Sequence, residues 1–180
     1  MDVYFVRHGE TEWNRSGRWQ GSFDVGLSEL GRSQAEEASS SFSGRQFDAI
    51  YASDLRRAWE TAEIIKTKTN VKEIIKDFRL RERALGEIEG KTTAEVSRLL
   101  SMDINIMDII GKNLSVRGME TLESQFQRVG QFIEDLKKLT FENVIVVSHG
   151  VTIGVMLEII TGKDFRKRKI DNCEIIRSKL

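Results

Sequence analysis

The sequence is poor in the residues that build disulfide frameworks and zinc sites. Its 180 residues include no proline, one cysteine (Cys173) and two histidines. A single cysteine cannot form an internal disulfide, and one cysteine with two histidines supplies too few ligands for a Cys/His metal site. We therefore expect no bound metal, and we interpret Cys173 as a small buried hydrophobic residue.

The chain also lacks an excess of charge and any long apolar run. Lysine plus arginine equals aspartate plus glutamate at 28 each, so the net charge is zero. Without a basic excess we expect neither a nucleic-acid partner nor a membrane partner, and the basic segment 165–169 (FRKRK) is interpreted as a solvated face. No run approaches the roughly 20 apolar residues that span a bilayer, and the first ten residues lack signal-peptide features. These absences favour a cytoplasmic protein.

Strand and helix patterns alternate along the chain. The uninterrupted apolar runs Val3–Val6 and Val144–Val147 predict buried strands, because strands covered on both faces have no polar alternation. The remaining predicted strands cover 47–53, 71–76 and 173–180, the last as an edge strand. The predicted helices cover 28–42 with Ser28 as N-cap, 55–69 capped by Ser53 and Asp54, a stretch from Thr92, 120–139 and 151–160. This pattern predicts a single domain over 1–180, an α/β fold built as a three-layer α/β/α sandwich with a mostly parallel central sheet.

Both histidines occupy the same position relative to a predicted strand. His8 ends VYFVRHG and His149 ends VIVVSHG, each directly before a glycine. If the two strands are parallel neighbours, both imidazoles lie at the sheet edge where open α/β folds bind ligands. Gly150 lets the backbone approach a ligand closely, and the helix near Val151 would direct N–H groups toward it. The pattern predicts an anion site.

Two arginine positions point to the same conclusion. Arg7 precedes His8, and an arginine beside an imidazole lowers the pKa of that imidazole unless an anion lies between them. Arg56 and Arg57 fall in the first turn of a predicted helix, where the helix dipole disfavours a cation. At least one of them therefore needs an anionic partner, and Arg56 can find one in Glu60, four residues on.

A glutamate in RLRERALGEIEG is a candidate proton donor. Glu82 lies between Arg81 and Arg83, which would hold it ionised, whereas a bound phosphate would favour its protonated form. Glu87 and Glu89 are interpreted as surface charges flanking a turn.

Taken together, these segments resemble a known family over nearly the whole chain. The segments are, in order, VRHGETEWN, GRWQGSFDVGLSELGRSQA, SDLRRAWETA, LRERALGEIEG, GMETLESQFQRV and VVSHG. They resemble the histidine phosphatase superfamily, the phosphoglycerate mutase-like proteins. The resemblance implies the phosphoglycerate mutase-like fold and metal-independent phosphoryl transfer through a phosphohistidine. Residues 24–28 depart from the family pattern, because Gly26 replaces a proline, and we expect a looser loop there.

The resemblance also assigns roles to individual residues. His8 matches the nucleophile, Glu82 the proton donor and His149 the second histidine, while Arg57 matches the second phosphate arginine better than Arg56 does. The catalytic residues it implies are His8, Glu82, His149, Arg7 and Arg57. The phosphate- and substrate-binding residues it implies are Arg7, Asn14, Gln20, Gly21, Arg57, His149 and Gly150. To attack phosphorus, His8 must be neutral, which the two arginines promote, and its other ring nitrogen needs an acceptor such as a backbone carbonyl.

The expected activity is hydrolysis of small phosphorylated metabolites without a cofactor. The related mutases resemble longer chains with an insertion that excludes water, and here only 92–117 is available as a lid, with 102–117 its least readable part. The alternatives are a phosphoglycerate mutase that uses 2,3-bisphosphoglycerate and an inactive module that binds phosphorylated ligands. The sequence leaves the substrate and the oligomeric state open, a homodimer included.

Overall fold

The computed structural model describes residues 1–104, 116–164 and 168–180. Its centre is a five-stranded sheet in the order β3-β2-β4-β1-β5. The strands are β1 (Asp2–Arg7), β2 (Ala49–Ala52), β3 (Ile74–Lys76), β4 (Asn143–Ser148) and β5 (Ile175–Lys179). Neighbouring pairs among β1 to β4 run parallel, and β5 lies antiparallel against β1 at the edge.

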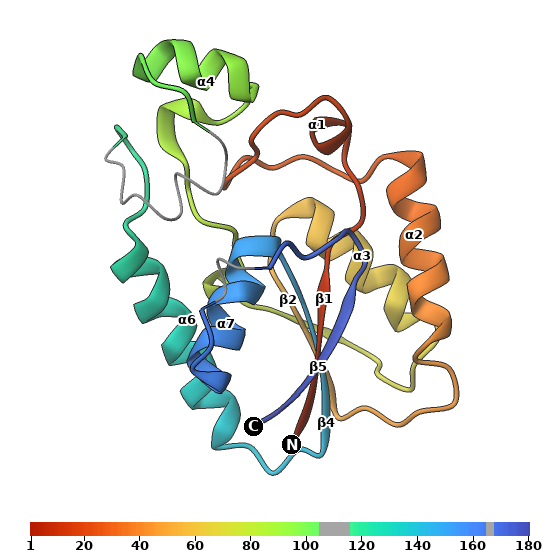
Figure 1. Cartoon of the computed structure of the whole chain (residues 1–180). Coiled ribbons are helices and arrows are strands. Elements are labelled where there is room, and N and C mark those ends of the chain that lie inside the picture. The colour runs from red at the N-terminus through yellow and green to blue at the C-terminus, as the bar shows by residue number, and fades with distance from the viewer. Residues whose placement is uncertain (105–115, 165–167) are drawn as a thin grey trace.

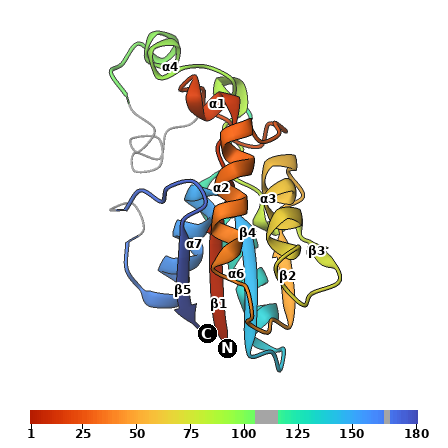
Figure 2. The ribbon, with the colours of Figure 1, turned by 90° about the vertical axis from the view of Figure 1, so that its right-hand side faces the viewer.

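Helices cover both faces of the sheet, which gives the three layers that the sequence predicts (Figure 1). One face carries α2 (Glu29–Ser40) and α3 (Arg56–Lys66), and the other carries α6 (Leu122–Lys137) and α7 (Gly150–Thr161). Beyond the carboxyl ends of the strands lie α1 (Glu12–Arg15) and α4 (Thr93–Leu100), as Figure 2 also shows. The short 3-10 helices η1 (Phe78–Leu80) and η2 (Gly86–Ile88) lie on the connection between β3 and α4.

The alternation of side chains along β1 explains why its apolar run is continuous. Val3 and Phe5 belong to the core cluster beneath α6 and α7, whereas Tyr4 and Val6 belong to the cluster beneath α3. Because every side chain of the run is covered by one helical layer or the other, no position is left for a polar residue. A third cluster around Trp19 packs beneath α4.

Most predicted elements are confirmed, with shifted ends. Ser28 caps α2 through a hydrogen bond from the Gly31 N–H, and α7 is buried over residues 152–156 and partly buried beyond them. The predicted strand 71–76 is confirmed only over Ile74–Lys76, and the helix predicted over 120–139 ends at Lys137. The central part of the predicted lid, 105–115, lies outside the described residues. Within the parts of the chain described, no helix is long and apolar enough to cross a membrane.

The prediction that Ser53 and Asp54 cap α3 is wrong. The N-cap residue of α3 is Leu55, with no side-chain cap of its own, and the Arg56 N–H donates instead to Asp24 Oδ1 at 2.6 Å. This hydrogen bond ties the loop containing Gly26 to the start of α3. Asp54 is free to receive another partner, as described below.

Candidate active site

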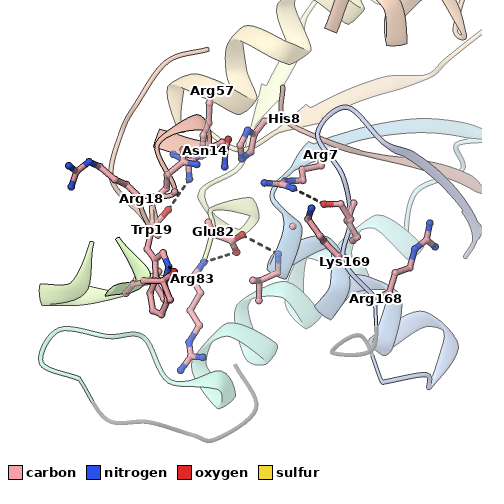
Figure 3. A pocket seen from close by; sticks show the side chains of 18 residues that line it. Arg7, His8, Asn14, Arg18, Trp19, Arg57, Glu82, Arg83, Arg168 and Lys169 are labelled. Atoms are coloured by element: carbon pink, nitrogen blue, oxygen red, sulfur yellow. Dashed lines mark hydrogen bonds between the residues drawn. The ribbon is translucent and has the colours of Figure 1, made fainter. Parts of the chain in front are cut away.

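A cavity of about 420 Å³ opens beyond the carboxyl ends of β1 and β4. The parallel pairing of these strands matches Arg7 with Ser148, so His8 and His149 are the next residues of two adjacent strands. Their ring centroids are 5.1 Å apart. The two imidazoles therefore lie together at one edge of the sheet, as the sequence predicts for parallel neighbouring strands. Figure 3 shows the side chains that line the cavity. Those the sequence singled out as site residues are Arg7, His8, Asn14, Gln20, Gly21, Arg57, Glu82 and Gly150.

His8 is held in one tautomer. Its Nδ1 lies 2.7 Å from the Gly9 carbonyl oxygen, and because a carbonyl only accepts, Nδ1 carries the proton and Nε2 keeps its lone pair. The predicted backbone acceptor is thus confirmed. Burial, followed by the charges of Arg57 and Arg7, holds the pKa of His8 well below its ordinary value of 6.5. The arginines do favour neutral His8, but desolvation is the larger cause.

Arg57 is a fully buried guanidinium with a spare donor. Its Nη1 and Nη2 donate to the carbonyl oxygens of Phe23 (2.7 Å) and Gly21 (2.8 Å), and its buried Nε has no hydrogen-bond partner. Burial lowers the pKa of Arg57 to about 10, which still leaves it charged at neutral pH. Arg56, by contrast, pairs with Glu60 at 2.6 Å on the surface, as predicted.

Arg7 repeats this arrangement from the opposite side of His8. Its Nη1 donates to the Ile170 carbonyl oxygen at 2.6 Å, and its Nε is buried without a partner. A buried charge whose donors are incompletely used is costly unless an anion completes its environment. The two arginines therefore define an anion site around His8.

Glu82 caps the helix that begins behind His149. Its Oε2 accepts from the Val151 N–H at 3.1 Å, and its Oε1 accepts from the Thr152 N–H at 3.2 Å and from the Arg83 N–H at 3.0 Å. The Thr152 hydroxyl lies 3.0 Å from the same Oε1. The helix N-terminus thus receives a carboxylate at its second and third residues, and of this turn Gly150 and Val151 line the cavity.

The two arginines that flank Glu82 in the sequence direct their side chains to other partners. Arg81 forms a bidentate pair with Asp54, at 2.7 and 2.6 Å. The side chain of Arg83 runs away from Glu82 (Figure 3), and its Nε donates to the Glu120 carbonyl oxygen at 2.7 Å. The hydrogen bonds to the Glu82 carboxylate come from backbone N–H groups and the Thr152 hydroxyl, which sequence patterns cannot reveal.

His149 lies next to the cavity rather than on its wall. Its ring is fully buried and is not among the lining residues. Its Nε2 lies 2.8 Å from Ser53 Oγ, and its Nδ1 is buried without a partner. Burial, followed by the charge of Arg57, holds the pKa of His149 well below 6.5.

Two amide side chains complete the anion site. The Asn14 amide oxygen accepts from the Thr11 N–H at 3.1 Å, which leaves the single proton of the Thr11 hydroxyl for the Gln20 amide oxygen at 3.0 Å. Their amide nitrogens are therefore the groups available to donate to a ligand in the cavity. Gly21 has φ +53°, and a Cβ there would lie 2.3 Å from Glu89 Oε1, so both conformation and space favour glycine.

The sequence interpretation missed Glu89. Glu89 was predicted to be a surface charge, and this is wrong: its Oε1 accepts from the Ser22 N–H (2.8 Å), the Ser22 hydroxyl (2.9 Å) and the Leu85 N–H (2.9 Å). It therefore fixes the loop whose carbonyl groups hold Arg57. No periodicity or motif marks a residue that binds backbone across a turn.

The cavity is more basic than the motifs predict. Arg18, Arg83, Arg168 and Lys169 also line it, and Figure 3 shows Arg168 and Lys169 on the side of Arg7. Residues 165–167 of the basic segment lie outside the described residues. The interpretation of that segment as a solvated face is incomplete, since its last two side chains are exposed and also face the cavity.

One further prediction concerns a metal. In the described residues, no three side chains of histidine, cysteine, aspartate or glutamate gather in a way that could hold an ion.

Cys173 is half-buried, and burial raises the pKa of its thiol to about 12.

Comparison with known proteins shows the family to which the chain belongs. Residues 3–180 match the histidine phosphatase superfamily (branch 1), and the chain belongs to that superfamily. It is 36% identical to phosphoserine phosphatase 1 of Hydrogenobacter thermophilus, over 93% of this chain and 79% of that protein. It is 33% identical to phosphoglycerate mutase-like protein 4 of Arabidopsis thaliana, over 97% of this chain and 77% of that protein.

A solved structure is similar in fold over the same length. The mycobacterial glucosyl-3-phosphoglycerate phosphatase, in complex with VO3, superposes with a TM-score of 0.86 at 27% identity, covering 98% of this chain and 91% of that one. The phosphoglycerate mutase-like α/β fold that the sequence predicts is thereby confirmed.

Proposed function

We propose that this protein is a phosphatase that hydrolyses small phosphorylated metabolites through a phosphohistidine at His8. The observation that carries the proposal is the state of His8. Its proton is committed to the Gly9 carbonyl, and its Nε2 lone pair is the nucleophilic position, near two arginines whose buried Nε donors are unused. A neutral imidazole in a cation-lined cavity suits attack on an anionic phosphoryl group.

In the first step, Nε2 of His8 attacks phosphorus while the ester P–O bond breaks. Arg7 and Arg57 would stabilise the charge on the equatorial oxygens, assisted by Asn14 and by His149, whose ring is 5.1 Å from that of His8. The leaving alkoxide takes a proton from Glu82, which lines the same cavity. This step leaves the phosphoryl group covalently attached to Nε2.

In the second step, a water molecule attacks the phosphohistidine. Glu82, now a carboxylate, takes a proton from that water, the P–N bond breaks, and inorganic phosphate leaves. The same group thus serves as acid and then as base, which restores the starting enzyme. We propose that the reaction needs no metal ion, because the arginines supply the positive charge.

Hydrolysis is favoured over mutase action by the shortness of the segment 92–117, which would serve as the lid, and by relatives named as phosphatases. The cavity volume of about 420 Å³ suits a small metabolite. The mutase alternative draws support from the relative named phosphoglycerate mutase-like. An inactive binding module is disfavoured, because the nucleophile, the acid and both arginines all line one cavity.

A single set of phosphorus NMR experiments separates these functions. The protein is incubated with phosphoserine or 3-phosphoglycerate, the latter with and without a trace of 2,3-bisphosphoglycerate, and His8→Ala is the control. We expect inorganic phosphate that depends on His8 and is unaffected by a chelator. Conversion of 3-phosphoglycerate into 2-phosphoglycerate that depends on the bisphosphate would establish the mutase alternative instead.

A further inference from the structure

His149 has a hydrogen-bond partner, Ser53, to which none of the sequence motifs assigned a role in the reaction. Ser53 is fully buried at the end of β2, where its N–H donates to the Val147 carbonyl oxygen at 3.0 Å. This bond joins Ser53 to β4 at Val147, which is two residues before His149. Its Oγ lies 2.8 Å from His149 Nε2 and accepts a hydrogen bond from the Leu55 N–H at 3.3 Å.

A count of protons decides which group donates in the Ser53–His149 hydrogen bond. A serine hydroxyl has one proton to give, and a neutral imidazole has one N–H and one lone pair. If the hydroxyl donates to Nε2, the imidazole proton sits on Nδ1, and one buried N–H remains without a partner. If Nε2 donates instead, both the serine proton and the Nδ1 lone pair stay unsatisfied in a buried place.

The first arrangement also suits the charge that the cavity attracts. An N–H beside an anion is stabilising, whereas a lone pair beside it is repelled. His149 is neutral at physiological pH, because burial and the charge of Arg57 disfavour its imidazolium form, so the choice of tautomer determines what the ring offers.

We propose that the Ser53 hydroxyl fixes His149 in the tautomer that carries its proton on Nδ1, so that this N–H is the donor offered to the phosphoryl group. Ser53 is then a positioning residue, acting through His149. The two neighbouring imidazoles have opposite tasks: the Gly9 carbonyl orients the lone pair of His8, and Ser53 orients the N–H of His149. The catalytic meaning of this assignment rests on the proposed function, while the tautomer itself does not.

Because the chain has only two histidines, the tautomer can be measured directly. Nitrogen-15 NMR of the protein labelled at histidine distinguishes a protonated ring nitrogen from an unprotonated one, and His8→Ala assigns the remaining ring to His149. We expect both rings of the wild-type protein to carry their protons on Nδ1. A proton on Nε2 of His149 would overturn the proposal, whether or not any substrate is turned over.

Variants then test whether Ser53 is the cause. In Ser53→Ala we expect His149 to lose its single tautomer, and kcat/KM for the best substrate to fall about 10- to 100-fold, the range typical of an orienting partner. Ser148→Ala is the matched control, since Ser148 is equally buried, adjacent to His149, and donates to the Leu80 carbonyl oxygen at 2.8 Å instead of to the ring.

Ser148→Ala should therefore leave the tautomer unchanged, and Ser53→Thr, which keeps a hydroxyl, should restore it. An unchanged Nδ1–H tautomer in Ser53→Ala would refute the role of Ser53. If Ser53→Ala does not fold, the wild-type spectrum still decides the proposal, because a proton on Nε2 of His149 would overturn it. Absence of turnover in the wild-type protein as well as in its variants would count against the proposed function and leave the tautomer assignment standing.

Discussion

The two buried histidines should make the folded protein sensitive to mild acid. Both have a pKa held well below 6.5 in the folded state, chiefly by burial. In the unfolded chain each returns to about 6.5, so below that pH the unfolded state binds more protons and stability falls as pH falls. Lowering the pH from 7.5 to 5.5 therefore costs roughly 1.4 kcal/mol for each histidine and about 2.7 kcal/mol for both.

Urea denaturation at intervals between pH 7.5 and 5.5 measures this loss. The buffer should contain no phosphate, because an anion bound to the folded state would add stability of its own. Carboxylates titrate mostly below this range, so they contribute little to the slope. In His8→Asn, which cannot titrate, the loss should shrink to roughly 1.4 kcal/mol. A wild-type stability that stays constant across this range would contradict the low pKa of the buried histidines. A loss of about 2.7 kcal/mol in His8→Asn, equal to that of the wild type, would contradict it as well.

Three substitutions test other parts of the structure. Glu82→Gln should slow the first step, phosphorylation of His8, by about 10²- to 10⁴-fold for esters with poor leaving groups while barely affecting the initial burst of p-nitrophenolate from p-nitrophenyl phosphate, and equal losses in this step on both substrates would remove Glu82 from the acid role. Glu89→Ala should cost about 2 kcal/mol of unfolding free energy and should weaken phosphate binding, measured by calorimetry. The control variant Glu87→Ala, at an exposed residue, should change stability by less than about 0.5 kcal/mol. Similar effects of the two substitutions would contradict the loop-anchoring role of Glu89. Gly9→Ala should destabilise by at least about 1–3 kcal/mol in urea, because its Cβ would lie 2.3 Å from the Gly31 carbonyl oxygen. Gly130→Ala, whose Cβ would meet Ile159 Cδ1 at an ordinary contact distance of 4.0 Å, should be neutral or stabilising, and a neutral Gly9→Ala would contradict the packing described.

The two central strands follow from a pattern that the sequence displays. The continuous apolar runs before His8 and His149 could be predicted as buried strands because a strand covered on both faces tolerates such a run, and the structure shows that the two are parallel neighbours. The pairing of these strands then places both histidines at one edge. Because the apolar runs predict the strands and the strands position the two histidines, the location of the cavity could be predicted without the structure.

The partners of the site residues could not be predicted in the same way. Sequence neighbours of Glu82 suggested arginine side chains, yet its carboxylate receives backbone N–H groups from a helix about 70 residues further along the chain. Likewise Asp24, rather than Asp54, receives the first N–H of α3. Such contacts depend on how loops cross in space, and a charged side chain in a sequence does not reveal which backbone will meet it.

The loop around Glu89 illustrates the same limit. A glutamate between glycines in a turn resembles a solvated charge, and its role becomes visible only when Ser22 is found against it. The basic side chains at the cavity, Arg168 and Lys169, are another case, because they reach it from the far end of the chain.

The phosphohistidine at His8 can be tested by trapping it. Glu82→Gln is mixed with p-nitrophenyl phosphate labelled with radioactive phosphorus and quenched in alkali within milliseconds to seconds. The aryl leaving group needs no proton donor, but water attack lacks its base, so the covalent intermediate should accumulate. The account predicts a protein-bound label that is stable in alkali, labile in acid and located on His8. No label during turnover, an acid-stable label, or a label that persists in the His8→Ala, Glu82→Gln double variant would contradict it.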